Sequence, residues 1–197
     1  MSNLARTYAE PSLFEFNDIS HHSSNFNSNL ATLSQRKECF LHALKGDTLK
    51  YKRYTKSPLR YGGGKSLAVG LIVEHFPNDI SRIISPFIGG GSVEVASALE
   101  LNLEVKAFDI FDILVNFWQL ASTNSQKLYD ELCQLEPNKE TYAWIKDELK
   151  KHYKNEAKLD KLTLARDYYF NFNLSYGPGF LGWMSKIYED KTRYANM

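Results

Sequence analysis

The stretch 81–99 constrains the fold of this chain most, because three consecutive glycines join a short apolar run to a helix pattern. The run "SRIISPFIGGGS" indicates a buried strand that continues to 87–88 and then enters a tight turn at 89–91. The pattern "SVEVASALELN" predicts a helix, for which Ser92 is the expected N-cap. Glycines let a backbone approach a ligand where a Cβ would clash, and a helix start offers unpaired N–H donors. The unit therefore predicts a ligand site in an α/β fold.

The segments on either side extend this unit into alternating helices and strands. "LEVKAFDI" predicts a second strand with Asp109 at its C-terminal end, and "FDILVNFWQLAS" predicts a helix after it. An earlier helix is expected in "KSLAVGLIVEHF", with these apolar residues facing a core: Leu67, Leu71, Ile72 and Phe76. This order implies an α/β domain with a parallel sheet. Only two strands are convincing, and two strands do not make a stable doubly wound sheet, so we expect an incomplete one.

Residues 125–197 have a different pattern. Amphipathic helices are expected at 125–135 and 140–154, and a third helix at 158–176 ends at "GPGFLGW". The expected apolar faces are Leu128, Leu132 and Leu135 in the first helix and Trp144, Ile145 and Leu149 in the second. Successive helices do not continue a parallel sheet, so they indicate a helical lobe. We divide the chain into an N-terminal extension (1–56), a ligand-binding α/β part (57–124) and this lobe (125–197).

The N-terminal extension contains a basic stretch that suggests contact with nucleic acid. Residues 17–35 are rich in Asn, Ser and His and are expected to form a loop, and a short helix near 35–44 ends at Gly46. The stretch 45–60 then carries six basic residues and one acid, with two tyrosines interleaved. Basic charge with aromatics is typical of nucleic-acid contacts, although a solvated basic loop is an equally good interpretation. The candidate contacts are Lys50, Lys52, Arg53 and Arg60.

Composition excludes several other classes of protein. The net charge of +1 favours no particular partner by itself. Cys39 and Cys133 lie far apart, and the five histidines show no metal-ligand spacing, so neither a disulfide framework nor a metal site is expected. The first ten residues contain no apolar run, and no stretch approaches the ~20 apolar residues that span a membrane. We therefore expect a cytoplasmic protein without a membrane partner.

The segment "SPLRYGGGKS", residues 57–66, ends like a nucleoside-triphosphate loop. Such a loop needs the pattern G-x-x-x-x-G-K-[ST] between a strand and a helix. Leu59 stands where the first glycine should be, and the residues before it are basic and polar. A triphosphate site that uses Lys65 and Ser66 is therefore the weaker alternative.

The glycine turn at 89–91 is the better nucleoside site. Asp109 follows Gly89 by 20 residues and ends the next strand, where an acidic side chain holds ribose hydroxyls in Rossmann-type sites. Glu94 stands where a dinucleotide site has a third small residue, so a pyrophosphate has a poor cradle. An adenosine ligand without phosphates fits better, and S-adenosylmethionine is the leading candidate. A tight turn followed by a surface aspartate is the alternative without a ligand.

The ordered motifs "LRYGGGKS", "PFIGGGSVEV" and "FDIFDILVNFW", followed by "YYFNFNLSYGPGFLGW", resemble the Dam-like DNA adenine-N6 methyltransferases over about residues 57–185. The resemblance implies a Rossmann-like fold with a helical lobe, S-adenosylmethionine as cofactor and double-stranded DNA as substrate, as in restriction–modification systems. It also implies that Tyr61 packs on the cofactor, Lys65 contacts the methionine carboxylate, and Asp109 accepts hydrogen bonds from the ribose beside Ile110. The loop under the methionine part would consist of Pro86, Phe87, Gly89, Gly91 and Ser92.

The chain departs from this family at Gly62, which makes the covering loop more mobile, and at "LSYGPGFLG", which leaves DNA contacts there uncertain. Two further departures concern the cofactor site and catalysis. Ser85 stands where the family commonly has Glu before Pro-Phe, which puts one polar contact in doubt. None of the six prolines are adjacent, so the family's catalytic Asp-Pro-Pro-Tyr segment is absent from this sequence. We therefore expect a cofactor-binding half without catalytic residues, inactive until a C-terminal segment or second subunit supplies that motif. A cofactor- or DNA-binding remnant without chemistry is the alternative.

Overall fold

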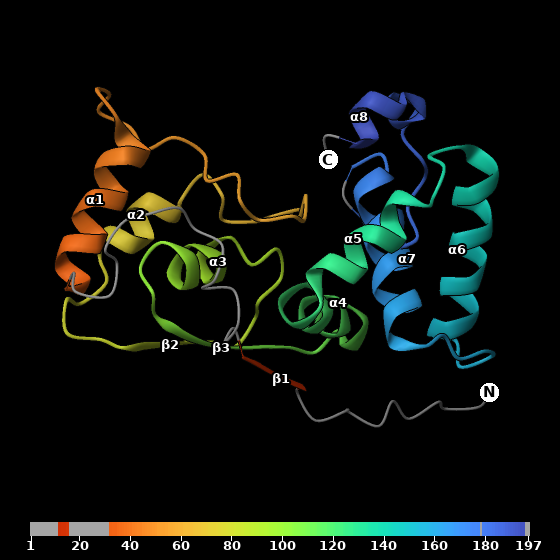
Figure 1. Ribbon diagram of the computed structural model, residues 1–197, viewed down its shortest axis with the longest axis horizontal. Helices are drawn as coiled ribbons and strands as arrows, with labels where there is room; N and C mark the ends of the chain where they lie inside the picture. Colours follow the sequence, from red (N-terminus) through yellow and green to blue (C-terminus); the bar gives the residue numbers. More distant parts are fainter. Residues whose placement is uncertain (1–11, 16–31, 178, 196–197) are drawn as a thin grey trace, which may run out of the picture.

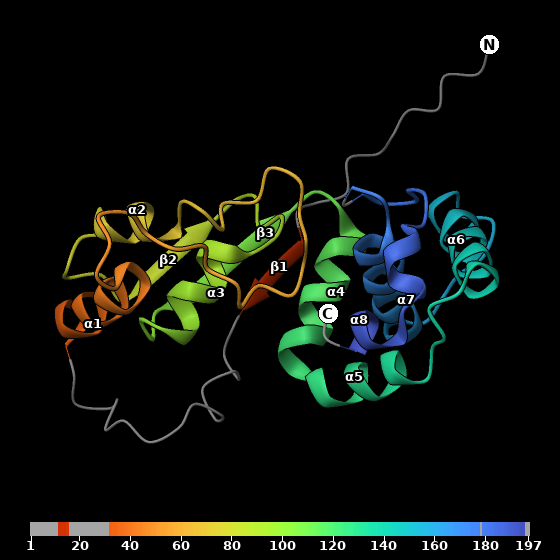
Figure 2. The same ribbon diagram turned by 90° about the horizontal axis from the view of Figure 1, so that it is seen from above.

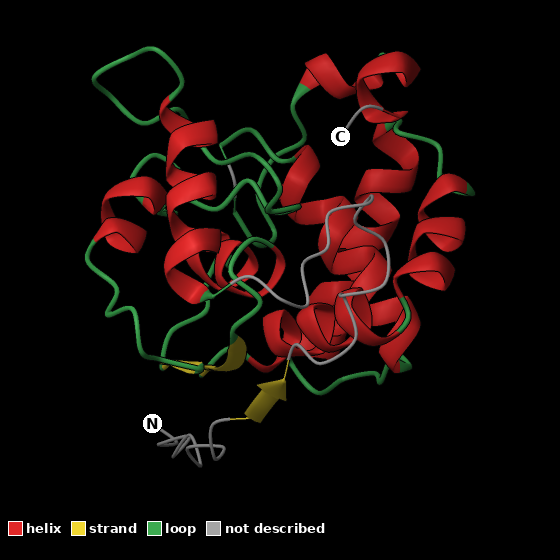
Figure 3. Cartoon of the chain, turned by 60° about the vertical axis from the view of Figure 1, so that its left-hand side comes forward, coloured by secondary structure: helices red, strands yellow, loops and turns green. Residues whose placement is uncertain are grey.

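The computed structural model describes residues 12–15, 32–177 and 179–195 (Figure 1). A small sheet with helices on one side lies next to a second group of helices, as two views at right angles show (Figures 1 and 2). Figure 3 shows the strands gathered at one edge of the molecule, below the helices. Among the described residues the helices are α1 (Leu33–Lys45), α2 (Val69–Glu74), α3 (Ser92–Leu99), α4 (Asp112–Thr123), α5 (Ser125–Cys133), α6 (Lys139–Tyr153), α7 (Lys161–Leu174) and α8 (Lys191–Ala195), and η2 (Lys186–Glu189) is a 3₁₀ turn.

The sheet has three strands in the order β1-β3-β2. Strand β2 (Arg82–Ser85) runs parallel to β3 (Glu104–Asp109), as the alternation of helices and strands predicted. Strand β1 (Ser12–Glu15) pairs antiparallel with β3 on its other side and was not predicted, because four residues carry too short a periodic signal. The result is a small mixed sheet with one parallel pair, and the described residues do not form a complete doubly wound sheet.

The sheet buries one face against α3. Val105 and Ala107 of β3 are fully buried, and Ser85 of β2 bonds to α3 on the same side. The expectation that β2 is a buried strand was wrong, since Ile84 on the opposite face is 68% exposed. That face carries ion pairs instead, with Arg82 Nε 2.6 Å from the Glu104 carboxylate. A strand alternates its side chains between two faces, so covering one face gives alternating burial.

The face predicted for α2 was only partly right, because Phe76 packs against the core as predicted but the two leucines do not. Val69 and Val73 are fully buried, whereas Leu67 and Leu71 are 61% and 54% exposed. The helix is also shorter than the apolar pattern suggested. Gly70 explains the choice of face, because a Cβ at this position would lie 2.3 Å from the ring of Tyr51. The packing of that tyrosine selects the side of α2 that faces inward.

Helices α1 and α3 to α7 agree closely with the predicted segments, whereas α8 was not predicted. Helix α1 begins after a capping box between Thr32 and Gln35 and ends at Gly46, as expected. Asn138 and Asp160 cap α6 and α7 through side-chain oxygens that accept from backbone N–H groups. The predicted loop at 17–35 lies almost entirely outside the described residues. Within the described residues, no helix is long and apolar enough to cross a membrane.

Helix α7 joins the helical lobe to the α/β part, because it packs against α4 as well as against α6. Phe117 and Trp118 of α4 and Tyr168 of α7 are buried, and Phe117 lies 5.9 Å from Tyr168 between ring centroids. In α6, Ile145 and Leu149 are buried as predicted. The same prediction was wrong for Trp144, which is 54% exposed, because its position lies off the stripe that meets α7.

Candidate functional site

The carboxyl ends of β2 and β3 meet through the side chain of Asp109. Its Oδ2 accepts a hydrogen bond from the backbone N–H of Gly89 at 3.1 Å, and its Oδ1 accepts from that of Phe111 at 3.1 Å. The N–H of Ile88 donates to the Phe108 carbonyl at 2.9 Å, so the turn after β2 stays fastened to β3. A carboxylate has about four acceptor positions, so Asp109 retains acceptor capacity for a ligand.

The glycine turn depends on residues without a side chain. Gly91 is the N-cap of α3 at φ 63°, so the prediction of Ser92 as N-cap was wrong by one residue. A cap in the left-handed region favours glycine, which explains the shift. A Cβ on Gly91 would lie 2.5 Å from the ring of Trp118, whose Nε1 donates to the Gly89 carbonyl at 3.0 Å. Because the glycines have no side chain, Trp118 of α4 can pack directly against the turn.

The segment 57–66 covers the glycine turn from the other side. A Cβ on Gly90 would lie 2.5 Å from the Cβ of Tyr61, and the Ser57 hydroxyl donates to the Gly90 carbonyl. The ring of Tyr61 stacks on Phe172 of α7, with 5.5 Å between centroids and 20° between planes. Burial raises the pKa of Tyr61, and the negative charge of Asp109 adds to this shift. The covering segment therefore packs against both the glycine turn and α7.

A cavity of about 510 Å³ lies between the covering segment and the turn, within the size range of small-molecule sites. It brings together seven of the nine residues predicted to hold a cofactor: Tyr61, Lys65, Phe87, Gly89, Gly91, Ser92 and Asp109. Pro86 and Ile110 do not line it, and Ile110 is 70% exposed. The lining also contains residues that sequence reasoning did not assign: Gly63, Gly64, Ile88, Gly90 and Glu94.

Besides Asp109, two more charged side chains of opposite sign line this cavity. Lys65 is exposed, and its Nζ donates to the Gly63 carbonyl at 2.8 Å. Glu94 is buried, and its Oε1 accepts from the Ser85 hydroxyl at 2.5 Å. Burial raises the pKa of Glu94, while the Ser85 bond and backbone N–H groups at the start of α3 oppose this shift. The position of Glu94 in the first turn of α3, after the glycines, was the signal that could have identified it.

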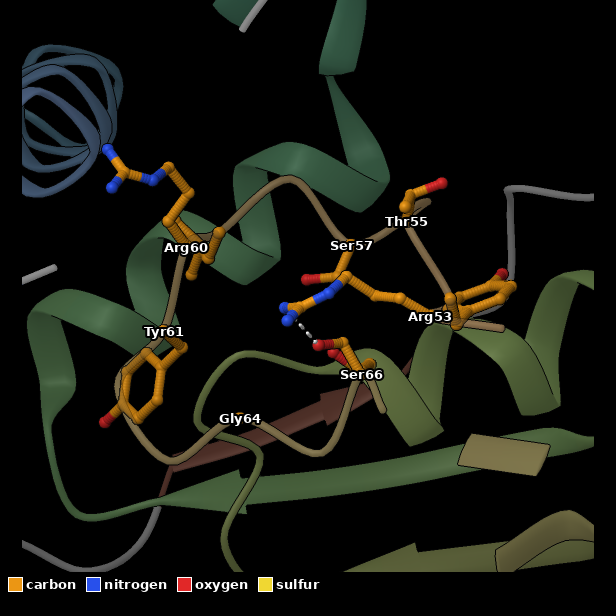
Figure 4. Close-up of a pocket in the computed structure, with 10 residues that line it drawn as sticks. Arg53, Thr55, Ser57, Arg60, Tyr61, Gly64 and Ser66 are labelled. Carbon is orange, nitrogen blue, oxygen red and sulfur yellow. Dashed lines mark hydrogen bonds between the residues drawn. The ribbon is translucent and has the colours of Figure 1, made fainter. Parts of the chain in front are cut away.

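A second cavity, of about 340 Å³, adjoins the first and shares Tyr61, Gly64 and Ser92 with it (Figure 4). Arg53 and Arg60 line it, whereas Lys50 and Lys52 are exposed elsewhere on the basic stretch. The structure thus brings together two of the four predicted DNA contacts. Their guanidinium groups already hold protein partners: Arg53 donates to the Ser66 hydroxyl at 3.1 Å, and Arg60 to the Asn173 carbonyl at 2.9 Å.

The geometry around Lys65 and Ser66 is not that of a triphosphate loop. The residues 51–61 before it form no strand, and helix α2 begins only at Val69. A phosphate loop needs a strand before it and a helix start directly after it. In the part of the chain that is described, no three His, Cys, Asp or Glu side chains are grouped as a metal site would require.

A protein-family model identifies the family of this chain. The family model for D12 class N6 adenine-specific DNA methyltransferases matches residues 61–197, a range that includes Tyr61, the glycine turn, Asp109 and the helical lobe. Comparison with curated proteins gives no match. The family match confirms the resemblance seen in the ordered motifs. Its extent, from the covering segment through the last helix, shows that this chain belongs to the D12 class of N6 adenine-specific DNA methyltransferases.

Proposed function

We propose that this chain binds S-adenosylmethionine in the cavity above the glycine turn and contributes this site to the N6 methylation of adenine in double-stranded DNA. One observation carries the proposal: the glycine turn, Asp109 and Lys65 surround a single cavity large enough for a small ligand. The glycines leave the backbone open to close approach, and their places could not hold a Cβ without displacing Tyr61 or Trp118.

Each wall of the cavity suits one part of this cofactor. Asp109 offers its remaining lone pairs to the ribose hydroxyls, and Ile110, just beyond the cavity, presents an apolar side chain to the adenine. Lys65 is a flexible point charge that can leave the Gly63 carbonyl for the methionine carboxylate. Tyr61, in the covering segment, packs on the cofactor, and Phe87 lies next to its methionine part. Since S-adenosylmethionine has no phosphates, the site does not need a loop that binds phosphate groups.

The bound cofactor supplies the methyl group, and the chain's own residues hold it and exclude water from it. The target amine needs a separate holder, which the family provides through Asp-Pro-Pro-Tyr. The six prolines of these 197 residues include no adjacent pair. We therefore assign no catalytic residue here and propose that methyl transfer requires an Asp-Pro-Pro-Tyr segment in addition, from further chain or a second subunit. Orienting the reactants can lower a barrier by about 7–11 kcal/mol.

The three parts of the chain then have separate tasks. Residues 57–124 form the cofactor-binding part, and residues 125–197 form the lobe that leads into DNA recognition. The basic stretch of the extension, with Lys50, Lys52 and Arg53, contacts backbone phosphates without reading sequence, and Arg60 joins it at the second cavity. Phosphate contacts set the register of the duplex, while the lobe approaches its bases.

Calorimetry with S-adenosylmethionine tests the proposal. Asp109→Ala and Lys65→Ala should each weaken binding by about 1.5–3 kcal/mol, roughly ten- to hundredfold, because each removes a charge-assisted hydrogen bond. Glu140→Ala, an exposed position of α6, is the control. Unchanged affinity in both site variants would refute the site. Tight ATP binding without S-adenosylmethionine binding would favour a triphosphate site instead.

A methyl-transfer assay on adenine-containing DNA separates the enzyme from a remnant. The chain alone should transfer no methyl group, and addition of a matched segment with Asp-Pro-Pro-Tyr should restore transfer. Activity of the chain alone would show that its own residues suffice. Failure of a matched segment to restore transfer, with cofactor binding intact, would favour a binding module without chemistry.

A further inference from the structure

We infer that Glu94 is a ligand-binding residue whose carboxylate accepts the ammonium group at the amino-acid end of the cofactor. The inference rests on the proposed function, because it assigns one more contact within the same cavity. Two structural facts carry it: Glu94 lines the cavity together with Lys65, and its carboxylate is held in place by Ser85.

Burial makes Glu94 unusual. The residue is only 7% exposed, and among the described residues it forms no ion pair. A buried ionised carboxylate is costly unless it is paired, so such groups are rare without a partner. The carboxylate accepts from the Ser85 hydroxyl at 2.5 Å and from backbone N–H groups at the start of α3, and since a carboxylate has about four acceptor positions, capacity for a ligand remains. The free protein therefore holds a carboxylate that lacks a cation.

The amino-acid end of the cofactor supplies that cation. This end carries an ammonium and a carboxylate group on one carbon, so a site that binds it needs an acceptor and a cation within a few ångströms. In this cavity Lys65 supplies the cation and Glu94 the acceptor, while the second carboxylate, Asp109, is bonded to the backbone N–H groups of Gly89 and Phe111. Hydrogen bonds between two charged groups are about twice as strong as neutral ones. The two side chains thus match a zwitterion, and neither alone does.

Ser85 is a positioning residue in this arrangement. The bond from Ser85 Oγ to Glu94 Oε1 shows that a carboxylate reaches the end of β2 from the first turn of α3. A helix start also favours negative charge. Ser85 thus orients the Glu94 carboxylate beside the glycine turn.

Two ligands isolate this contact. S-adenosylhomocysteine carries the amino-acid end, and 5′-methylthioadenosine has the same nucleoside and thioether without it. Calorimetry on the full chain should show that Glu94→Gln weakens binding of the first about ten- to hundredfold and leaves binding of the second within about twofold. Glu140→Gln, on the exposed face of α6, should change neither affinity. Ser85→Glu combined with Glu94→Gln should restore part of the lost affinity.

The outcomes separate this inference from the proposed function. Wild-type chain that binds neither ligand would overturn both. Wild-type chain that binds both ligands, with no change in Glu94→Gln, would overturn only the role of Glu94. An equal loss for the two ligands would also overturn it, because that result means a general disturbance of the cavity. A loss confined to S-adenosylhomocysteine, with rescue by the relocated carboxylate, supports the inference.

Discussion

The side-chain amide of Asn173 holds the peptide segment that ends at Arg60. Its Oδ1 accepts from the Arg60 backbone N–H at 3.0 Å, and its Nδ2 donates to the Pro58 carbonyl at 3.0 Å. Asn173 is fully buried in the last turn of α7, directly after Phe172, on which Tyr61 stacks. The helical lobe therefore fixes the segment that covers the cavity, although more than a hundred residues separate the two in sequence.

Replacement of Asn173 by Ala should loosen the covering segment. The change leaves a backbone donor and a backbone acceptor without partners, which costs about 1–3 kcal/mol for each group that stays buried. We expect a lower urea midpoint and faster trypsin cleavage after Arg60 in the folded protein. Asn124→Ala is the control, because Asn124 is exposed and makes no side-chain capping bond. Equal cleavage rates in the two variants would contradict this role of Asn173.

Alanine at two glycines should separate backbone strain from a clash. Gly91 and Gly63 both have positive φ, but a Cβ on Gly63 meets nothing within 4 Å, whereas one on Gly91 meets the Trp118 ring at 2.5 Å. Gly63→Ala should cost about 1–2 kcal/mol of unfolding free energy from strain alone. Gly91→Ala should add about 1–3 kcal/mol from overpacking. Urea denaturation measures both, and equal losses would mean that the turn relaxes away from α4.

Glu94 should make the unfolding free energy depend on pH. Burial raises its pKa in the folded state above the ordinary value for Glu, so the folded state binds more protons than the unfolded state between these two values. Stability from this group is fully present below the unfolded pKa and falls as pH rises through the folded pKa. Glu94→Gln should remove that fall and stabilise the free protein near neutral pH. The difference between wild-type and variant curves measures it; a difference independent of pH would argue against ionisation of Glu94.

The basic stretch should determine the salt dependence of DNA binding. Each lost phosphate contact should reduce the slope of log affinity against log salt by about 0.9. Lys50→Gln with Lys52→Gln should therefore lower the slope by about 1.8, measured by titration of a duplex across a salt series. Arg82→Gln is the control, because Arg82 belongs to β2, outside the basic stretch and the lobe, and pairs with Glu104. A slope that matches wild type would identify the stretch as solvated surface.

The local elements of this protein follow from its sequence. Helix α1 and its end at Gly46, the position of Asp109 at the end of β3, and the start of α6 after Asn138 all depend on residues within a few positions of one another. Periodicity, glycine conformation and side-chain caps act over one or two turns, so the sequence alone determines them. The ordered motifs likewise predicted the family that the family match confirms.

Contacts between segments that are distant in sequence could not be predicted, because they form only when the whole chain folds. The inward face of α2 depends on Tyr51 against Gly70, and Trp144 is exposed because α7 meets another side of α6. The Glu94 carboxylate is buried and bonded to Ser85 of β2, and the covering segment is held by Asn173 of α7. Such choices depend on which surfaces meet when the chain closes on itself. The sequence pattern indicates which face of a helix is apolar and which side chains are acidic. Which residues that face or side chain contacts depends on packing across the whole fold.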